Sequence, residues 1–275
     1  MPRHKHSKNP NVKTLEVIAD NWWNDPTLVS RESSRTKTPH DPLALTQLVA
    51  TRSSVVQDPH GEAVKKFMEW LRHGQKMDLE SMSASDILHE LKKGMIYIDN
   101  LFFFSLLSRK VKLQTEVSRL VRLEFTDGTP AMRANGDYLR ARYSKDDESP
   151  FIEIWRYDAL GNPYSFGIFV YILMHEMCHA FFSIFGDRRH PNCRQWIDDY
   201  QGHGEMFWVL HRFMMGKIEG YLEAEHIDPK LWREGMEEMD RSCHMVTGHD
   251  GKPDGWGTPE RMLKGGIQDH DRSKH

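Results

Sequence analysis

The sequence predicts an α+β domain in which a small, mostly antiparallel sheet packs on helices around one central helix. Three observations support this fold class. Apolar residues recur at helical spacing from residue 61, four short strand-like segments follow between 110 and 157, and an almost wholly apolar stretch covers 166–185. Helices and strands in separate runs are typical of α+β proteins rather than of alternating α/β folds.

Composition narrows the class of protein. The 275 residues have a mean hydropathy of -0.65, which is too low for a polytopic membrane protein. Because the formal net charge is -3, the whole molecule is not attracted to nucleic acid, and a DNA contact would have to use local basic residues.

The cysteines and the first residues bear on the cellular location. Cys178, Cys193 and Cys243 include no C-x-x-C pair, so neither a disulfide framework nor a zinc ribbon is expected. Such sparse cysteines fit a reducing compartment. The basic start, MPRHKHSKNP, lacks the apolar segment of a secretory signal. We therefore expect an intracellular protein, nuclear or cytoplasmic.

Three regions follow from the distribution of polar residues. Residues 1–60 are rich in Pro, Ser, Thr, Arg and His and are predicted to be mostly disordered, with room for one short helix in the run LALTQLVA. Residues 61–220 hold the folded domain. Residues 221–275 form a polar tail, in which one short helix around Leu231–Met239 is compatible with the pattern.

Two helices are predicted at the start of the folded domain. The first begins at Gly61 and ends at His73-Gly74, and the second spans about 84–93, with Ser83 or Ser85 as its cap and Gly94 as its end. The apolar run Leu101–Leu107 is too short to span a bilayer and is expected to be buried.

Four strands are predicted next, from alternating apolar and polar residues with turn signals between them. They are expected at Lys110–Glu116, Leu120–Phe125, Tyr138–Tyr143 and Phe151–Tyr157.

The long apolar helix is predicted to begin at Asn162-Pro163 and to end at Gly186. Its apolar residues occur on all sides, which is typical of a buried central helix. A polar loop follows at 187–202, and a further helix is expected to begin near His203-Gly204, with Phe207 anchoring it in the core.

The motif His175-Glu176-Met177-Cys178-His179 lies within the apolar helix. Residues four apart lie on one helix face, so both imidazoles can bind the same cation, and neutral imidazole suits Zn²⁺. Glu176 lies beside the metal, where it can take a proton from a zinc-bound water and pass it to a leaving amine. The alternative interpretation is a pair of hydrogen-bonded core histidines with a buried glutamate.

A catalytic zinc site needs a third protein ligand, and His203 is our candidate because it opens a helix that Phe207 anchors. His190, in the loop, and His211, on the same helix as His203, compete for this role. His211 has the further alternative of being a core residue or a residue that supports a ligand. One zinc ion per chain is expected.

At these residues the sequence resembles the SprT-like zinc metalloprotease domain, found in Spartan-type DNA–protein crosslink proteases. The resemblance is carried by HEMCHAFF and GHGEMF, and more loosely by IDNLFFFSLLSRKVKL and FIEIWRY, over roughly 84–220. It implies a zincin-like fold, with His175, His179 and His203 as zinc ligands and Glu176 as the catalytic acid/base. It also implies protein substrates, DNA-bound or DNA-crosslinked, although the zinc ribbon of many members is absent.

Further parts of such a site have candidates in the sequence. Tyr200, His190 and Arg189 could stabilise an oxyanion, and nothing in the sequence chooses among them. The strand Phe151–Tyr157 is the candidate for holding an extended substrate by main-chain pairing.

Other reactive or basic residues have explanations that require no specific function. Cys178 points away from the histidine face and is interpreted as a core residue. The spacing of Cys243-His244 and His249 matches no trusted metal site. A basic strip beside the cleft is predicted either as solvated strand faces or as a local DNA contact; its members are Arg119, Arg122, Arg140 and Arg142.

Three other functional classes are alternatives to an active zinc endopeptidase. In an inactive zincin, zinc is structural and the domain only binds a protein or DNA partner; a metal-free interaction domain holds no zinc at all. An intramembrane protease would need several spans, and no segment other than 166–185 approaches the required length, so no membrane contact is expected. The intact Glu176 favours an active zinc endopeptidase.

Overall fold

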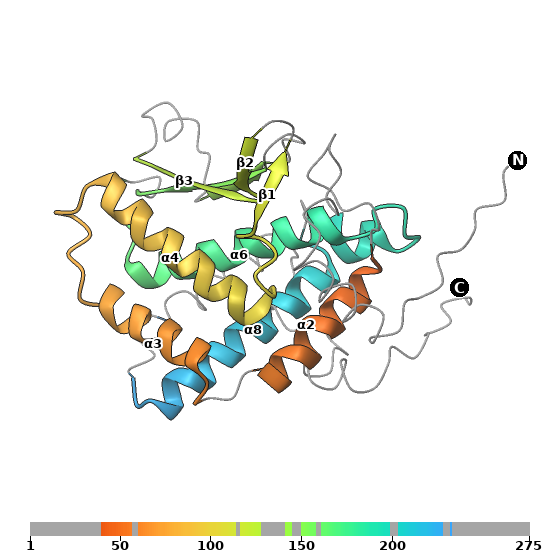
Figure 1. Cartoon of the computed structure of the whole chain (residues 1–275), viewed down its shortest axis with the longest axis horizontal. Coiled ribbons are helices and arrows are strands. Elements are labelled where there is room, and N and C mark those ends of the chain that lie inside the picture. The colour runs from red at the N-terminus through yellow and green to blue at the C-terminus, as the bar shows by residue number, and fades with distance from the viewer. Residues whose placement is uncertain are drawn as a thin grey trace, which may run out of the picture.

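The computed structural model describes residues 40–56, 60–113, 116–127, 141–144, 150–157, 161–198, 203–227 and 232. In chain order its elements are α2 (Pro42–Val56), α3 (Glu62–Gly74), α4 (Ala84–Phe102), β1 (Lys110–Leu113), β2 (Glu116–Arg119), β3 (Arg122–Thr126), β4 (Ala141–Ser144), β5 (Phe151–Trp155), α6 (Phe166–Phe185), η2 (Arg194–Asp198) and α8 (Glu205–Ala224). The strands lie on one side of the packed helices (Figure 1). The mixed helix-and-sheet class predicted from the sequence is confirmed.

The described strands form two small sheets. β1 and β2 form an antiparallel pair, and the other sheet has the order β3-β5-β4. In that sheet β3 runs parallel to β5, with Arg122 opposite Phe151, and β4 runs antiparallel to β5, with Ala141 opposite Ile154. The central sheet is therefore mixed.

The position of β5 contradicts one prediction. The strand within Phe151–Tyr157 was our candidate for pairing with a substrate, but β5 is the central strand, and both of its backbone edges are occupied. A strand that pairs on both sides has no free hydrogen-bonding edge. Alternation of apolar and polar residues reports which face is buried and does not distinguish central from edge strands.

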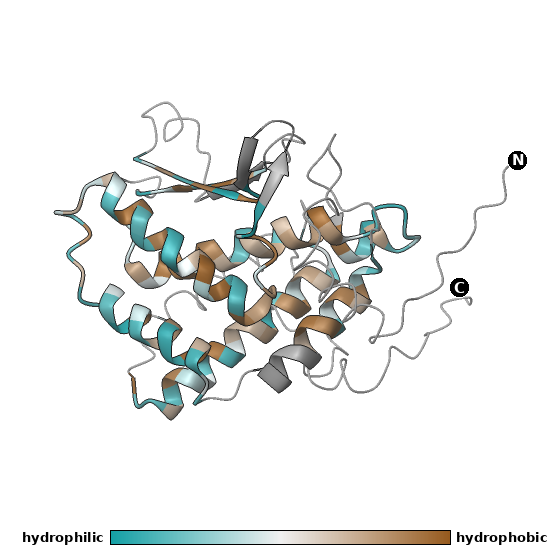
Figure 2. Cartoon of the chain, in the orientation of Figure 1, coloured by the Kyte–Doolittle hydropathy of each residue, from teal (hydrophilic) through white to brown (hydrophobic). Residues whose placement is uncertain are grey.

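α6 lies at the centre of the described fold. It packs against α4, α8, β4 and β5, and nearly all of its residues are buried. Figure 2 shows this helix mainly in apolar colours, whereas α3 and α4 have polar outer faces. α6 is long and apolar enough to cross a membrane by length and composition, but 83% of its most apolar window is buried inside the protein. The apolar surface of this helix is therefore buried in the core of the domain.

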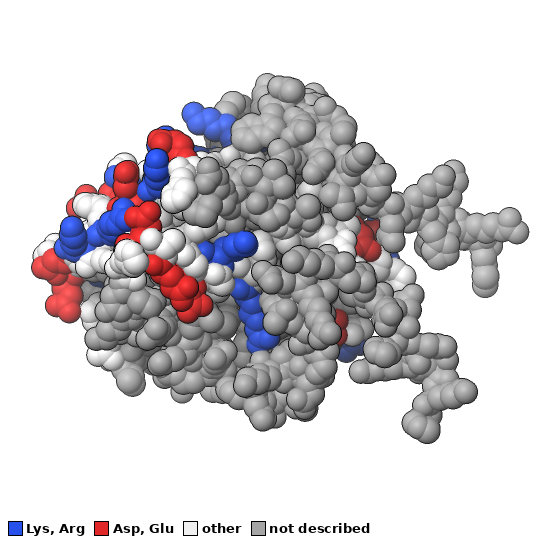
Figure 3. All heavy atoms as spheres, turned by 90° about the horizontal axis from the view of Figure 1, so that it is seen from below, with Lys and Arg blue, Asp and Glu red and all other residues white. Residues whose placement is uncertain are grey.

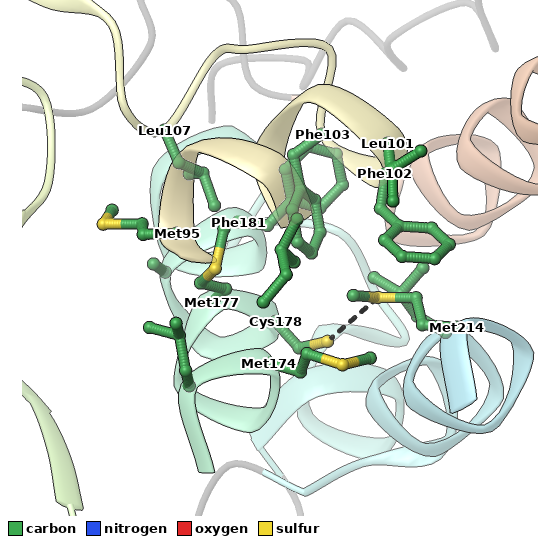
Figure 4. Close-up of a cluster of buried hydrophobic side chains, with 14 of the residues drawn as sticks. Met95, Leu101, Phe102, Phe103, Leu107, Met174, Met177, Cys178, Phe181 and Met214 are labelled. Carbon is green, nitrogen blue, oxygen red and sulfur yellow. Dashed lines mark hydrogen bonds between the residues drawn. The ribbon is translucent and has the colours of Figure 1, made fainter. Parts of the chain in front are cut away.

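Aromatic and sulfur-containing side chains fill the space between α4, α6 and α8. Figure 4 shows this cluster. It includes Met95, Leu101, Phe102, Phe103, Leu107, Met174, Met177, Cys178, Phe181 and Met214. The Sγ atom of Cys178 lies 3.7 Å from the Sδ atom of Met214. Burial, with a smaller contribution from the charge of Glu176, raises the pKa of the Cys178 thiol well above its usual value. Cys178 is therefore a neutral core residue.

The folded region begins before the predicted boundary at residue 61. α2 buries Leu45, Leu48 and Val49 and packs against α8 and α4. The chain just before it is fixed by backbone hydrogen bonds, in which His40 donates to Phe185 at 2.8 Å and Asp187 donates to His40 at 2.7 Å. The apolar run near residue 43 was thus a better guide than the polar composition around it.

Two helix ends differ from prediction. α4 continues through Gly94 to Phe102. Gly94 does not end the helix; the Trp70 ring packs so closely on its backbone that a Cβ atom would come within 2.2 Å of the ring. α6 begins at Phe166 rather than at Asn162-Pro163, since Ser165 is its cap and its hydroxyl accepts a hydrogen bond from the Ile168 N–H. The predicted caps Ser83 and Gly186 are confirmed.

The loop after α4 is organised by a buried carboxylate. Asp99 is fully buried and accepts hydrogen bonds from the N–H groups of Leu107 at 3.2 Å and Ser108 at 2.6 Å. In the segment between Asp99 and Leu107, Phe104 and Ser105 adopt positive φ angles of 57° and 58°, which residues other than glycine rarely adopt. Burial raises the pKa of Asp99 to about 7, against the opposing effect of these hydrogen bonds.

This pKa predicts a pH dependence of stability. Because the unfolded carboxyl titrates near 3.8, the native state holds its proton more tightly, so the stability contributed by Asp99 is lost as pH rises from about 4 through about 7. The loss is on the order of a few kcal/mol. Urea unfolding of the wild type and of Asp99→Asn, both in the presence of a chelator, at pH 5 and pH 8 should show that the wild type loses stability relative to the variant. Parallel pH profiles would contradict this expectation.

Candidate metal centre

Two imidazoles of the H-E-x-x-H motif share one face of α6. His175 and His179 are one helical turn apart and half-buried, and their Nε2 atoms lie 3.2 Å from each other. The expected relation of residues four apart on a helix is therefore present.

His203 completes a triad from a different part of the chain. It directly precedes Gly204, the N-cap of α8, and is also half-buried. Its Nε2 atom lies 2.9 Å from that of His175 and 3.2 Å from that of His179. The structure thus brings together the three residues that the sequence predicted as metal ligands.

The spacing of these nitrogens fits a metal ion. A tetrahedral ion with Zn–N distances of about 2.0–2.1 Å holds its nitrogen ligands about 3.3 Å apart. The three Nε2 separations, 2.9–3.2 Å, are close to that value. Three imidazole lone pairs at this distance repel one another unless a cation or a shared proton lies among them. Among the described residues, this triad is the group whose ligand atoms are close enough to hold a metal ion.

Phe207 supports all three rings from within the core. It is fully buried and stacks on His179, with ring centroids 4.4 Å apart and an interplanar angle of 28°. Its ring meets His175 and His203 edge-on, at 4.8 and 4.9 Å. Trp208, on α8, stacks on His203, with ring centroids 5.5 Å apart. The sequence indicated Phe207 as an anchor but gave no sign of the role of Trp208.

Glu176 lies next to the triad on the buried helix. Its side chain is only 7% exposed, although a carboxylate is normally found at the surface. Burial of an acidic group on the helix that carries His175 and His179 is explained if a nearby cation compensates its charge. The position is compatible with the acid/base role predicted from the motif.

The two competing histidines lie outside the triad. His190 pairs with Asp41, with Nε2 3.0 Å from Oδ2, and stacks on Trp196 at 4.8 Å. His211 is fully buried, and burial, followed by the charge of His203, lowers its pKa to about 3. Its ring is therefore neutral at physiological pH.

The remaining candidates are placed only in part. Arg189 is exposed, and its backbone N–H donates to Asp187 at 2.9 Å. Arg119 donates to the Ser108 carbonyl at 2.6 Å, and Arg122 lies 3.3 Å from Glu124. Arg142 belongs to β4, whose side chains are not described. Tyr200, Arg140, Cys243, His244 and His249 lie outside the described residues, as does most of the predicted helix at 231–239, of which only the buried Trp232 is placed.

Gly204 fixes how closely the loop approaches α8. Its N–H donates to the Ile197 carbonyl at 3.1 Å, and Gln195 donates to Glu205 at 2.7 Å. A Cβ atom at Gly204 would come within 2.4 Å of the Trp196 carbonyl carbon and 2.5 Å of the Ile197 nitrogen. Only glycine allows the π-helical segment η2 to pack this closely on the residue after His203.

Gly204→Ala is therefore expected to displace His203. Because the clashing atoms belong to the backbone, we expect a destabilisation of about 1–3 kcal/mol and an affinity for a metal ion at the triad about 10-fold lower. Gly216→Ala on the same helix is the control, since nothing lies within 4 Å of its added carbon; it should keep the metal affinity and gain up to about 1 kcal/mol. Thermal unfolding and chelator competition measure both quantities. Equal metal affinities in the two variants would contradict the expectation.

Comparisons of the chain with protein-family models, curated proteins and solved structures gave no match.

Proposed function

We infer that this protein is a zinc-dependent endopeptidase of the SprT-like type. The observation that carries this inference is the convergence of three imidazole nitrogens within 3.2 Å of one another, two of them from the buried helix that also carries the buried Glu176. A structural zinc site uses four protein ligands, whereas a catalytic site uses three and leaves one position for water or substrate. The triad offers three.

The donor set favours zinc. Neutral imidazole is a borderline ligand that binds Zn²⁺ well. Carboxylates would favour harder ions and thiolates softer ones, and among the described residues neither belongs to this group of ligand atoms. When bound, zinc would polarise the scissile carbonyl and acidify water. His175, His179 and His203 would hold the ion.

Glu176 supplies the proton transfers. Its carboxylate is positioned by the same helix turn as His175, so its distance from the reacting atoms is set by a rigid, buried element. The carboxylate accepts a proton from the attacking water and then delivers it to the amine of the departing peptide. Cys178 is not a competing nucleophile, since its thiol is buried and neutral.

β4 replaces β5 as our candidate for substrate pairing. Among the described strands β4 pairs only with β5, and it packs against α6, the helix that carries the motif. An extended peptide could add to this edge by main-chain hydrogen bonds. This arrangement would hold the scissile bond close to the triad independently of side-chain sequence.

The proposal that the substrates are DNA-bound or DNA-crosslinked proteins rests on the family resemblance. Arg119 and Arg122 already make contacts within the protein. On the face shown in Figure 3, acidic and basic side chains of the described residues are interspersed. A DNA contact would therefore be local, and DNA would act by bringing enzyme and substrate together.

Metal analysis combined with proteolysis tests the proposed function. The full chain, purified without chelators, should contain one zinc ion and should cleave a DNA-binding protein, faster with single-stranded DNA than without it. Removal of zinc by a chelator should stop cleavage, and added zinc should restore it. Stoichiometric zinc without cleavage of any protein, with or without DNA, would instead identify an inactive zinc-containing binding module. Absence of zinc would identify a metal-free interaction domain.

A further inference from the structure

A fourth histidine lies behind the triad and has no role in the proposed reaction. His211, on α8, is fully buried, and neither of its ring nitrogens has a hydrogen-bond partner among the described residues. A neutral imidazole has one N–H donor and one acceptor nitrogen, and burying either of them without a hydrogen bond destabilises the folded protein. An apolar residue of similar size would avoid this cost, so the polar ring needs an explanation.

The surroundings of His211 connect it to one ligand. Its ring centroid is 5.6 Å from that of His175, at an interplanar angle of 74°, and 5.9 Å from that of Phe207, at 5°. Tyr171 meets it edge-on at 5.3 Å. Trp208 lies 6.3 Å away, and its Nε1 atom is also buried without a partner. Unsatisfied polar atoms of two residues therefore gather beside the buried side of His175.

His211 is not a fourth ligand. Among the described residues, the only group of three or more side chains whose ligand atoms all lie within 4.8 Å of one another is His175, His179 and His203. It also forms no direct hydrogen bond with His175, because both of its nitrogens lack partners. A link between the two rings must pass through something small and polar. Buried water typically makes about three hydrogen bonds to such groups and is nearly as favourable as a direct contact.

We propose that His211 is a positioning residue that holds the His175 ring, through one buried water molecule, in the orientation that metal binding requires. This proposal rests on the metal centre proposed above. Residues that hydrogen-bond to a ligating histidine fix its tautomer and ring orientation, and their loss typically lowers metal affinity about 10- to 100-fold. The stack on Phe207 holds the His211 ring in place.

Two substitutions of matched size separate hydrogen bonding from packing. His211→Gln keeps a donor and an acceptor, whereas His211→Met has a similar length and volume but no N–H group. Zinc affinity is measured on the full chain by chelator competition, with thermal unfolding of the zinc-free protein as the check of folding. The visible absorption spectrum of the Co²⁺-loaded protein reports the ligand geometry.

We expect His211→Met to bind zinc at least about 10-fold more weakly than the wild type and to shift the Co²⁺ spectrum. His211→Gln should stay within about 3-fold of the wild type and keep the spectrum. Wild-type affinity in the Met variant, or equal losses in both variants, would overturn the proposal. If the zinc-free Met variant does not fold, the Gln variant decides, and a 10-fold loss there overturns the proposal. Failure of the wild type to bind zinc would instead overturn the metal centre itself, which makes the two failures distinguishable.

Discussion

Replacement of Glu176 by glutamine is expected to abolish peptide hydrolysis while leaving zinc bound. Glutamine has nearly the same size and shape, so the packing of this buried position on α6 is retained. It cannot accept the proton of the attacking water, and loss of a general base lowers kcat by about 10²- to 10⁴-fold. The measurement is kcat/KM on a DNA-binding protein substrate, together with the zinc content of the same preparation.

A surface substitution provides the control for this variant. Glu223→Gln makes the same chemical change at an exposed position near the end of α8 and should alter neither activity nor zinc content. If the Glu176→Gln protein keeps its zinc and cleaves at the wild-type rate, Glu176 is not the acid/base. If it loses its zinc, the carboxylate has a role in holding the metal that the motif does not predict.

Local signals in the sequence located most helices. Ser83, Gly186 and the start of α8 were predicted correctly because caps and helical spacing are properties of neighbouring residues. The errors arose where distant segments determine the conformation. The pattern predicts a helix end at Gly94, but this glycine is a point of close contact with Trp70, which no local pattern reveals. The single strand predicted at Lys110–Glu116 is wrong, because the chain there forms β1 and the start of β2, which pair with each other.

The same distinction between local signals and contacts of distant segments applies to the candidate site. The i, i+4 relation placed His175 and His179 on one face, and this needed only a helix. The choice of His203 over His190 depended on tertiary contacts that the sequence left open. Asp41, which precedes α2, pairs with the Nε2 atom of His190. Gly204 allows the loop to bring His203 against α6.

Loss of His203 is expected to have the largest effect on metal binding. His203→Ala leaves two ligands, both on α6, and should weaken zinc binding by at least about 100-fold, which corresponds to about 2.7 kcal/mol. At a free zinc concentration of 100 times the wild-type Kd, zinc should stabilise the wild type by about 2.7 kcal/mol and the variant by about 0.4 kcal/mol at most.

His190→Ala is the matched control for this variant, because His190 is the histidine of the 187–202 loop that the sequence left as an alternative ligand. Its ring is held by Asp41 and Trp196, so its loss should cost some stability and leave zinc affinity within about 3-fold of the wild type. Zinc titration of both variants, followed by thermal unfolding with and without zinc, distinguishes the two histidines. Unchanged zinc affinity in His203→Ala, with a loss in His190→Ala, would mean that the loop rearranges to supply a different third ligand. The triad described here would then not be the metal centre.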